Sequence, residues 1–520
     1  MSRSLYGRLY RTYGTPPSHS DRLRFTAEKI QELEQAASFE LEELGDVQRR
    51  ASNIDVAIIG AGFAGLAAGW WLSKHGFRVT IYEAASDIGG RVLTNVDKVS
   101  QRMIEAGGEL IGRNHPRWLW FAREFGLGLS VLTSEDQYGY ASLKTPLVIG
   151  GCTLTRAQQE TVFQEMTDAL VTLNADASQV SAYHPWTAKP AAKWDQETVG
   201  QWLAKVPAMI PKCSQDTLDA LRFELENNQA VPIDDQSYLG LLAEVRGGAL
   251  TPLGAPNRGP SEYWTESEVF RCASGNQQLA RELLAQIRKR GGSVSFNTPV
   301  NTLTVAPAGV QVNGTHQVAW AILAAPPSVW NKITVTGAQL SKMQMGSAIK
   351  YLCDVDGRFW LHKGLAPSAT ADGLGMIWEG TDNQNLPQGS GAEMSLFAGG
   401  PAAQTALQSQ NVNRYLQAGL DSIYPGFKSA LVADQLRNWP SEPWIGAGYS
   451  CPAKGQVMTV AQHLYDPPGR LLFAGEHTCM AFFGYMEGAL ESGLHAALLI
   501  AQREKVPQAV AAWQKKQTAI

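Results

Sequence analysis

The pattern of apolar and polar positions is most informative between Asp55 and Glu83, where it predicts a strand, a helix and a second strand in succession. The apolar run Val56–Ile59 is typical of a buried parallel strand, and the uncharged stretch that follows fits a turn and a buried helix. A second strand is predicted over Arg78–Tyr82 and ends at Glu83. This order predicts a β-α-β unit at the beginning of an α/β domain.

Three glycines stand where the first strand turns into the helix, because Gly60, Gly62 and Gly65 form the pattern GxGxxG. Gly60 permits a tight turn, Gly62 lets backbone approach a pyrophosphate, and Gly65 lets the helix pack closely against the strand. The helix N-terminus, with Phe63 and Ala64, offers free N–H groups to phosphate. Since strand, turn, helix, second strand and acidic residue occur in order, we interpret this segment as a dinucleotide-binding unit.

Glu83 and the residues after it narrow the choice of dinucleotide. A carboxylate at the end of the second strand accepts hydrogen bonds from a ribose diol and repels a 2′-phosphate, so FAD or NAD fits and NADP does not. The neighbouring Ala84 belongs to the same predicted site. Gly89, Gly90 and Arg91 can bring backbone and a guanidinium to the diphosphate from its other side, which an ordinary NAD dehydrogenase does not need. The sequence therefore favours FAD.

Two later segments carry patterns that fit the same domain. Residues 274–292 predict a helix ended by glycine, and strands over 293–296, 300–305, 310–312 and 320–324 then predict a β-meander. Near the end of the chain, a strand over 471–474 precedes a loop and a helix that begins near Tyr485. Because long inserts separate these pieces, we expect interleaved domains. The expected parts are a helical extension (1–50), a cofactor-binding domain (51–112, 268–328 and 434–505), a substrate-binding domain (113–267 and 329–433) and a tail (506–520).

Composition excludes several functional classes. The 520 residues suffice for about two domains, and a net charge of −4 without a long Lys/Arg run argues against nucleic acid as a partner. The six cysteines form no CxxC pair, which indicates a reduced compartment and no structural metal. The nine histidines show no HExxH spacing, so no metal site is predicted. We expect small molecules as ligands.

No segment has the pattern of an export signal or a membrane anchor. The first fifty residues contain no apolar stretch of signal-peptide length, and residues 26–50 are charged and predict a helix. Residues 56–72 are uncharged, but their glycines fit strand, turn and helix better than a membrane span. We therefore expect a cytoplasmic protein without a membrane partner.

Taken in order, the motifs resemble the flavin-containing amine oxidases, the family that includes monoamine oxidases, polyamine oxidases and L-amino-acid oxidases. The resemblance covers roughly residues 53–503. Its segments are GAGFAG (60–65) with Glu83, GGR (89–91), EAGGELIG (105–112), SGNQQLA (274–280), AILAAPP (321–327), Lys350 before FW (359–360), Trp439 with GAGYS (446–450), FAGEHT (473–478) and GYMEGALESG (484–493). LNAD, VPIDDQSYLG, YWTESEVFRC and the N-terminal SLYGRLYRTYG are similar to bacterial members described as L-amino-acid oxidases or flavin monoamine oxidases.

The resemblance implies an α/β fold, in which a Rossmann-like FAD-binding domain of the GR2 type is interleaved with an α+β substrate-binding domain. It also assigns further residues to FAD. Gly475 and Glu476 lie beside the ribityl and pyrophosphate portion, Met486 lies against the isoalloxazine ring, and the backbone of Val300 binds adenine. Gly107, Gly108 and Leu110 pass along the edge of the ring, and Glu109 belongs to the same segment.

The resemblance also implies a catalytic set. Lys350 matches the lysine that holds a water against flavin N5, where an ammonium stabilises the negative charge that develops as oxygen is reduced. Tyr449 and Tyr485 match the two aromatic positions that flank the substrate nitrogen and orient it toward N5, and Tyr485 borders the cofactor as well. Trp439 packs near this pair. Monoamine oxidases attach FAD through a cysteine directly before the first tyrosine, and because Gly448 stands there we expect noncovalent FAD.

The implied reaction is oxidation of a CH–NH bond to an imine, which water hydrolyses to ammonia and a carbonyl while O2 becomes H2O2. A homodimer is common among such enzymes. An amino-acid substrate needs a partner for its carboxylate, for which Arg113, Arg117, Arg222 and Arg246 are candidates. The substrate therefore stays open between a primary amine and an L-amino acid. Two further alternatives are a flavin desaturase and a noncatalytic flavin-binding protein, neither of which explains Lys350 or the paired tyrosines.

Overall fold

The structure of the protein is a computed structural model that describes residues 3–16, 53–96, 101–132, 143–254, 259–382, 384 and 391–506. The helix predicted over 26–50 and the tail beyond residue 506 lie outside the described residues.

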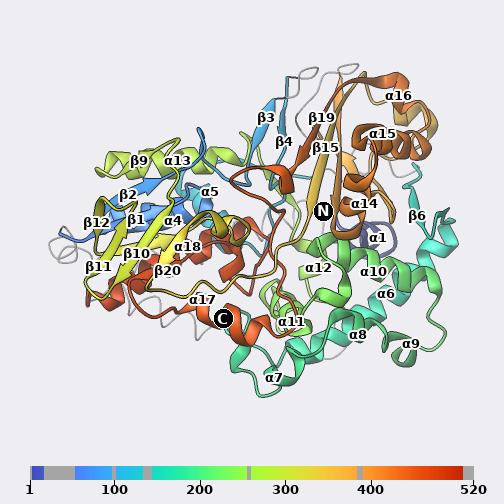
Figure 1. Ribbon diagram of the computed structural model, residues 1–520. Helices are drawn as coiled ribbons and strands as arrows, with labels where there is room; N and C mark the ends of the chain where they lie inside the picture. The colour runs from blue at the N-terminus through green and yellow to red at the C-terminus, as the bar shows by residue number, and fades with distance from the viewer. Residues whose placement is uncertain are drawn as a thin grey trace.

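A five-stranded parallel sheet, in the order β20-β13-β1-β2-β9, forms the centre of one half of the described chain. Strand β1 (Asp55–Ile59) pairs in parallel with β2 (Arg78–Tyr82) on one side and with β13 (Trp320–Leu323) on the other. The outer strands β20 (Leu471–Phe473) and β9 (Ser293–Ser295) pair in parallel with β13 and β2. The α/β fold expected from the sequence is confirmed, and Figure 1 shows this sheet on the left.

Helices α4 (Phe63–Lys74), α13 (Gln277–Lys289) and α18 (Met486–Arg503) pack with this sheet. Residues 63–73 of α4 are all buried, because α4 lies between the sheet and its neighbouring helices. The contact with α18 is very close: a Cβ on Gly493 would lie 2.1 Å from the carbonyl oxygen of Ala64. Helix α5 (Pro116–Glu124), from the segment assigned to the substrate-binding domain, packs into the same hydrophobic core.

The predicted four-stranded meander is wrong in part. Strands β10 (Thr302–Ala306), β11 (Gly309–Val312) and β12 (His316–Val318) do form an antiparallel meander, and β14 (Thr334–Thr336) pairs with β10. The first and last predicted strands are β9 and β13, which belong to the parallel sheet instead. All four residues of β13 are buried, as a strand covered on both faces requires.

A second, mixed sheet forms the centre of the other half, in the order β19-β15-β18-β17-β16-β6-β7 among the residues described. Its long central strand β15 pairs antiparallel with both β18 and β19. Helices α14 (Gly400–Gln408), α15 (Val412–Ile423) and α16 (Phe427–Ala430) pack on it, at the upper right of Figure 1. The strands are β6 (Leu147–Ile149), β7 (Cys152–Thr153), β15 (Ala348–Val355), β16 (Ala369–Ala371), β17 (Gly375–Glu379), β18 (Ala392–Gly399) and β19 (Leu431–Asn438).

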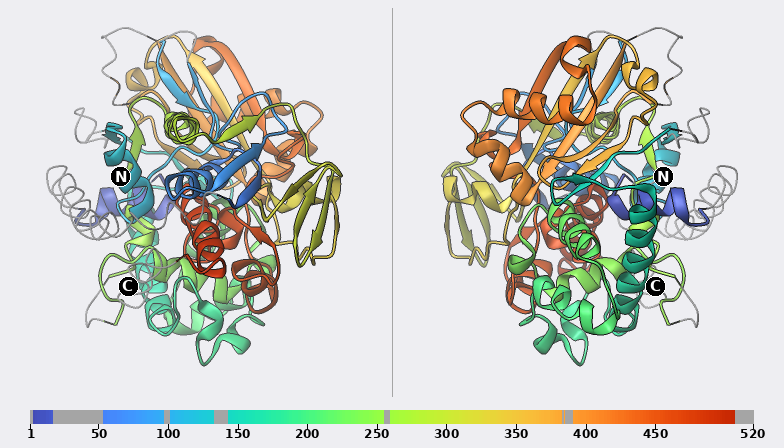
Figure 2. Two further views of the ribbon diagram at one scale, coloured as in Figure 1. Left: turned by 90° about the vertical axis from the view of Figure 1, so that its left-hand side faces the viewer. Right: turned by 90° about the vertical axis from the view of Figure 1, so that its right-hand side faces the viewer.

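A group of helices lies below this sheet, as both views of Figure 2 show. These helices are α6 (Arg156–Ala177), α7 (Ala191–Trp194), α8 (Val199–Leu203), α9 (Val206–Met209), α10 (Gln215–Gln229), α11 (Tyr238–Gly247), α12 (Tyr263–Glu266) and α17 (Gln462–Tyr465). The N-terminal helix α1 (Leu5–Tyr13) packs into the same core, where Leu5, Tyr6 and Leu9 are buried. The first described residues are therefore part of a packed core.

Two short antiparallel pairs join the two halves. Strand β3 (Thr94–Val96) pairs with β4 (Met103–Glu105), and β5 (Leu129–Val131) pairs with β8 (Phe270–Cys272). These pairs place Glu105 and Arg271 next to the second sheet, because Glu105 accepts through its carbonyl from Lys350 on β15 and Arg271 contacts Glu379 on β17.

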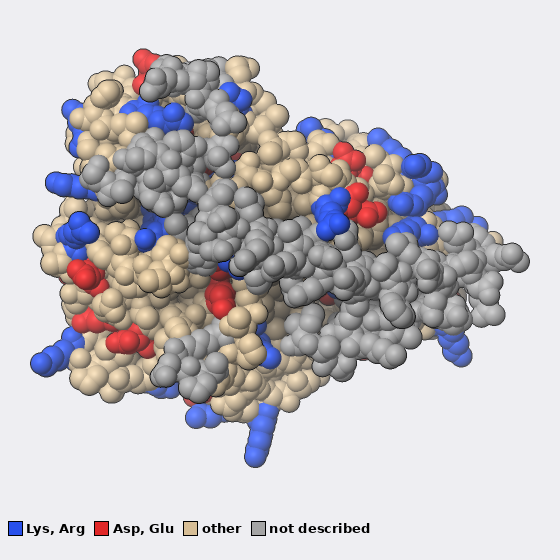
Figure 3. Space-filling view, turned by 180° about the vertical axis from the view of Figure 1, so that it is seen from behind, with Lys and Arg blue, Asp and Glu red and all other residues tan. Residues whose placement is uncertain are grey.

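The described surface carries both signs of charge. On the face shown in Figure 3, acidic and basic side chains both occur and are separated by wider areas of other residues. Among the described residues, no helix combines the length and the apolar character that crossing a bilayer requires.

Candidate active site

A cavity of about 440 Å³ lies where the two sheets meet. Its walls include residues at the carboxyl ends of β1, β2, β13 and β20, and residues of β15, β17 and β18. Ligands of open parallel sheets bind at the carboxyl ends of the strands. Every residue that the sequence assigned to the cofactor or to catalysis lines this cavity, with the exception of Gly65.

One end of the cavity is a turn of bare backbone. Gly60 has φ +108°, a conformation that favours glycine. Gly62 precedes α4 without a side-chain cap, so among the described residues no side chain caps the first N–H groups of the helix at the cavity. A Cβ on Gly62 would meet no atom closer than 4.0 Å, whereas a Cβ on Gly65 would lie 2.0 Å from the carbonyl oxygen of Gly60. Gly65 therefore acts through packing, and the turn fits the diphosphate of a dinucleotide.

Glu83 is held at the wall beside this turn. Its carboxylate accepts hydrogen bonds from the backbone N–H of Ala61 at 2.6 Å and of Ala85 at 2.7 Å. Burial raises the pKa of Glu83, and these N–H groups act in the opposite direction. The fixed carboxylate lies at the end of β2, where it can accept from a ribose diol.

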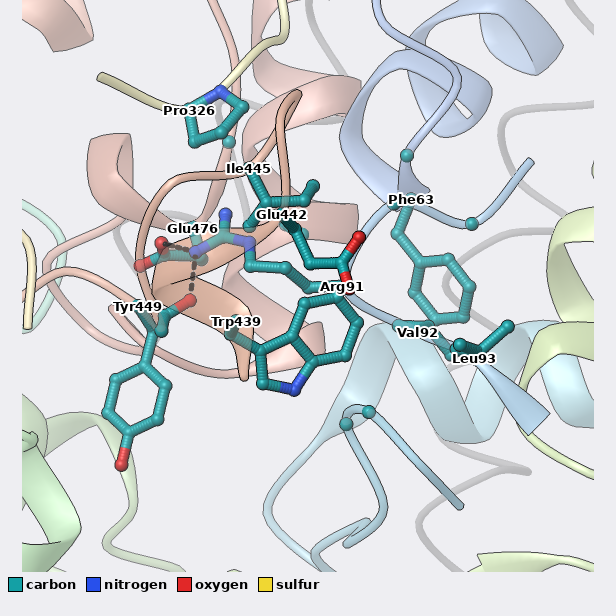
Figure 4. Close-up of a pocket in the computed structure, with 18 of the residues that line it drawn as sticks. Phe63, Arg91, Val92, Leu93, Pro326, Trp439, Glu442, Ile445, Tyr449 and Glu476 are labelled. Atoms are coloured by element: carbon teal, nitrogen blue, oxygen red, sulfur yellow. Dashed lines mark hydrogen bonds and ion pairs between the residues drawn. The ribbon is translucent and has the colours of Figure 1, made fainter. Parts of the chain in front are cut away.

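Arg91 and Glu476 form an ion pair at the cavity wall, with Nη1 of Arg91 2.7 Å from Oε1 of Glu476 and 3.0 Å from the carbonyl oxygen of Gly448 (Figure 4). Glu476 also accepts from the hydroxyl of Ser450 at 2.5 Å and from the N–H of Gly484 at 2.6 Å. Burial acts to raise the pKa of Glu476, but the charge of Arg91, the neighbouring His477 and the hydrogen bonds from Ser450 and Gly484 together outweigh it, and the pKa is lowered. The ionised carboxylate therefore joins the loops that carry Tyr449 and Tyr485.

Glycines also shape the segment from Gly107 to Leu110. A Cβ on Gly107 would lie 2.1 Å from the carbonyl oxygen of Arg91, and a Cβ on Gly108 would lie 3.2 Å from Cγ of Met486, the first residue of α18. Asn276 donates through Nδ2 to the carbonyls of Gly108 and Glu109. Close approach of this segment to α18 thus depends on residues without side chains.

The two tyrosines lie together at the other end of the cavity. The hydroxyl of Tyr449 donates to the carbonyl oxygen of Asn228 at 2.8 Å, and a Cβ on Gly484 would lie 3.1 Å from the Tyr449 ring. Tyr485 makes edge-to-face contacts with His115 and Tyr263 at centroid distances of 5.3 and 6.4 Å. Burial raises the pKa of both phenols well above the ordinary value, so both are neutral.

Trp439 lines the cavity near Arg91 (Figure 4). The guanidinium carbon of Arg437 lies 5.2 Å from the Trp439 ring, and Arg437 pairs with Glu442 at 2.5 Å. In Figure 4 the Tyr449 ring points away from the ion pair of Arg91 and Glu476.

Lys350 extends from β15 toward the segment of Gly107 to Leu110. Its Nζ donates to Oε2 of Glu109 at 2.5 Å and to the carbonyl oxygen of Glu105 at 2.7 Å, and it lies 5.5 Å from the ring centroid of Trp378. An ammonium has three donors, so one remains for a group in the cavity. The sequence motifs assign Lys350 to catalysis and Glu109 to the cofactor segment, and the structure places the two side chains in direct contact.

Several lining residues were not predicted. They include Asn228, Gln229, Glu268, Met376, Trp378 and Phe397. Glu268 lies within YWTESEVFRC, a segment that carried the resemblance without a role for this residue. Trp378 and Phe397 lie on β17 and β18, where nothing in the sequence marks them as different from other buried strand residues.

None of the four arginines considered for a substrate carboxylate lines the cavity. Arg113 pairs with Glu266 at 3.2 Å, Arg117 pairs with Glu491 at 2.5 Å, and Arg222 lies on α10 beside Glu226. The arginines among the described lining residues are Arg91 and Arg437, and each is paired with a glutamate.

Comparison with known proteins agrees with this geometry. Residues 63–501 match the family model of flavin containing amine oxidoreductases. The chain is 25% identical over 472 residues to amine oxidase [flavin-containing] B of Cavia porcellus, which covers 86% of each chain. It is also 25% identical over 480 residues to an L-amino acid dehydrogenase of Synechocystis, which covers 86% of this chain and 95% of that protein.

The fold is shared with solved amine oxidases. Cyclohexylamine oxidase from Brevibacterium oxydans superimposes with a TM-score of 0.73 at 21% identity, covering 87% of this chain and 99% of that one. Putrescine oxidase bound to putrescine gives a TM-score of 0.71 at 20% identity, covering 86% and 99%. With the glycine turns, Glu83 and Lys350 around one cavity, these matches show that the chain belongs to the flavin-containing amine oxidoreductases and that its cofactor is FAD.

Proposed function

We propose that the protein catalyses the oxidative deamination of a small primary amine, with an L-amino acid as the second candidate substrate. In this reaction a CH–NH bond becomes an imine, water hydrolyses the imine to ammonia and a carbonyl, and O2 becomes H2O2. The observation that carries the proposal is that Lys350, Tyr449 and Tyr485 line the same cavity as the glycine turns.

The glycine end of the cavity holds FAD in this proposal. The backbone N–H groups of Phe63 and Ala64 bind the diphosphate, and the carboxylate of Glu83 binds the ribose diol. Bound FAD supplies the acceptor for hydride from the substrate and, when reduced, the electrons for oxygen. The support is the uncapped helix N-terminus together with an open space in front of Gly62.

Tyr449 and Tyr485 orient the substrate nitrogen. Neutral phenol rings attract a cationic amine on arrival and hold its carbon–hydrogen bond toward the cofactor. The hydrogen bond from Tyr449 to Asn228 and the contacts of Tyr485 with His115 and Tyr263 fix both rings.

The walls favour a simple amine over an amino acid. Both arginines among the described lining residues already have glutamate partners, while the acidic Glu268 and the carbonyl of Asn228 favour a cationic group. The name of the Synechocystis relative is the argument for an L-amino acid.

Noncovalent attachment of FAD is part of the proposal. The described lining residues include no cysteine, and Cys451 and Cys479 are buried elsewhere. A Cβ at Gly448 would lie 2.7 Å from that of Ala348, so a side chain there requires rearrangement of β15. Precipitation with trichloroacetic acid should release the yellow cofactor into the supernatant, and colour that stays in the pellet would contradict this assignment.

A substrate panel tests the function. Purified holoenzyme is mixed with primary amines and with L-amino acids, and bleaching of the flavin without oxygen is recorded beside peroxide and ammonia formed in air. We expect bleaching, peroxide and ammonia with at least one amine. Bleaching without peroxide would reject O2 as the acceptor, as in a dehydrogenase. Failure of every amine and amino acid to bleach the flavin would overturn the proposal.

A further inference from the structure

Both carboxylate oxygens of Glu109 accept hydrogen bonds from side chains of three strands, β8, β15 and β17. Oε2 accepts from Nζ of Lys350 at 2.5 Å, and Oε1 accepts from Nε of Arg271 at 2.8 Å and from Nε1 of Trp378 at 2.9 Å. The side chain of Glu109 is 3% exposed, so bulk water does not screen these interactions.

The chain of charges continues to the N-terminal segment. Arg271 pairs with Asp382, and Asp382 pairs in turn with Arg3, whose side chain is 2% exposed. The order is Lys350, Glu109, Arg271, Asp382 and Arg3, so positive and negative groups alternate. The backbone N–H of Arg3 also donates to Glu268, an acid of the cavity wall. The N-terminal segment is thus connected to the cavity by two routes.

The electrostatic balance shows which charges reach Glu109. Burial acts to raise the pKa of Glu109, but Lys350 and Arg271 outweigh it, and Arg3 contributes in the same direction, so the pKa is lowered. An ionised carboxylate in direct contact with a buried ammonium favours the charged form of that ammonium. Without the carboxylate of Glu109, Lys350 would lose its direct anionic partner, while the positive charge of Arg271 would remain nearby.

We propose that Glu109 is the positioning residue of Lys350 and holds the ammonium at the cavity wall in its charged form. The strength of the interaction between Glu109 and Lys350 depends in turn on the charges of Arg271, Asp382 and Arg3. The inference rests on the role of Lys350 in oxygen reduction that the proposed function gives it.

Other charged groups surround Lys350 and enter the interpretation of any pH profile. Glu105 on β4 and Glu393 on β18 are buried carboxyls whose pKa is raised by burial, to about 7 for Glu105. Arg437 lies opposite Lys350 on β19 and pairs with Glu442. Replacing Glu109 leaves all of these groups in place.

The experiment follows reoxidation of the flavin, which needs no knowledge of the substrate. Holoenzyme is reduced with dithionite, mixed with oxygenated buffer in a stopped-flow instrument, and followed from pH 6 to 10. The quantity compared between the wild type and the variants is the pH at which the rate constant declines on the alkaline side. In Glu109→Gln this decline should move down by at least about one pH unit. In Lys350→Met the decline should be absent, and Glu109→Gln/Lys350→Met should behave as Lys350→Met alone.

Further variants test the direction of the shift in pH and serve as controls. Arg271→Gln should move the decline to higher pH, and Arg3→Met should move it in the same direction by less. Glu109→Asp keeps the charge and should restore a profile close to the wild type. Glu266→Gln removes another buried carboxylate, which pairs with Arg113 away from the cavity, and should leave the profile unchanged. Melting midpoints of the holoenzymes should be non-additive for Glu109→Gln and Lys350→Met.

Each result is decisive. An unmoved decline in folded Glu109→Gln, or additive losses in the double variant, would overturn the inference. If Glu109→Gln retains no flavin, the opposite shift in Arg271→Gln and the wild-type profile of Glu109→Asp carry the test, and a shift of Arg271→Gln to lower pH would overturn it. Slow reoxidation of the wild type itself, unaffected by Lys350→Met, would instead contradict the proposed oxidase function.

Discussion

The glycine end and the side-chain end of the cavity obey different physical constraints. Around Gly60, Gly62 and Gly475 the wall is backbone, and what matters is that no Cβ intrudes. Around Lys350 and Tyr485 the wall is made of side chains, and what matters is which charge or ring stands there. Steric changes should therefore abolish function at the first end, whereas changes of charge or polarity should alter rates at the second.

The largest effect is expected at Gly65. In Gly65→Ala the new Cβ would lie 2.0 Å from the carbonyl oxygen of Gly60, so the turn and α4 must separate. We expect a loss of stability of about 3 kcal/mol or more and little bound flavin. Urea denaturation and the ratio of flavin to protein absorbance measure both, and a stable, fully yellow variant would break the comparison.

Gly62→Ala separates folding from cofactor binding. The new Cβ would lie no closer than 4.0 Å to any described atom, and Gly62 has φ −74°, which alanine adopts freely. We expect a folded protein that binds FAD about a hundredfold more weakly, because the methyl group occupies the path of the diphosphate. Fluorescence titration of flavin into stripped protein checks this, and unchanged affinity would contradict the placement of the diphosphate.

Lys350→Met tests the side-chain end without a large steric change. Reoxidation by O2 should slow about a hundredfold, because an ammonium no longer stabilises the developing negative charge, while reduction by substrate changes little. Stopped-flow measurement of both half-reactions distinguishes this result from equal slowing of both, which would reject the assigned role.

Tyr485→Leu should give a smaller effect that is confined to the substrate. Loss of the aromatic face should lower kcat/KM for a primary amine about tenfold, with flavin content and reoxidation unchanged. Steady-state peroxide assays measure it. The matched change Tyr263→Phe keeps the ring beside Tyr485 and removes the hydroxyl that donates to Glu244, so it should cost less. A larger loss in Tyr263→Phe would show that the hydrogen-bonded support matters more than the ring.

The smallest effect is expected at Glu224, a buried residue of α10 that contacts the N-terminal helix. Burial and the charge of Glu268 raise the pKa of Glu224 to about 7, while its carboxylate accepts from the N–H of Leu5 at the start of α1. A raised pKa gives stability that is full below the ordinary pKa of a glutamate and is lost as the pH rises through about 7. Glu224→Gln should therefore reduce the drop in melting temperature between pH 5 and pH 8 by about 2 °C. An unchanged drop would show that Glu224 is ionised in the folded protein.

The same division explains how much could be predicted from sequence. The turn at Gly60–Gly65 and the acid at Glu83 follow from local spacing, because one β-α-β unit fixes them. The contact of Lys350 with Glu109 joins residues 241 positions apart, and no local pattern encodes it. The sequence places the strand over 320–324 in the meander, because an apolar run does not indicate which sheet a strand joins. Arg113 and Arg117 had suitable chemistry, but their buried glutamate partners became visible only in three dimensions.

The close packing of Gly493 against Ala64 also has a consequence for biosynthesis. Helix α18 closes the core that β1 and α4 begin, yet more than four hundred residues separate them, and β20 must first join the edge of the parallel sheet. A ribosome that has released only the first three hundred residues has made neither element. The core around β1 and α4 therefore cannot be completed until the residues of α18 have been synthesised, more than four hundred residues after those of α4.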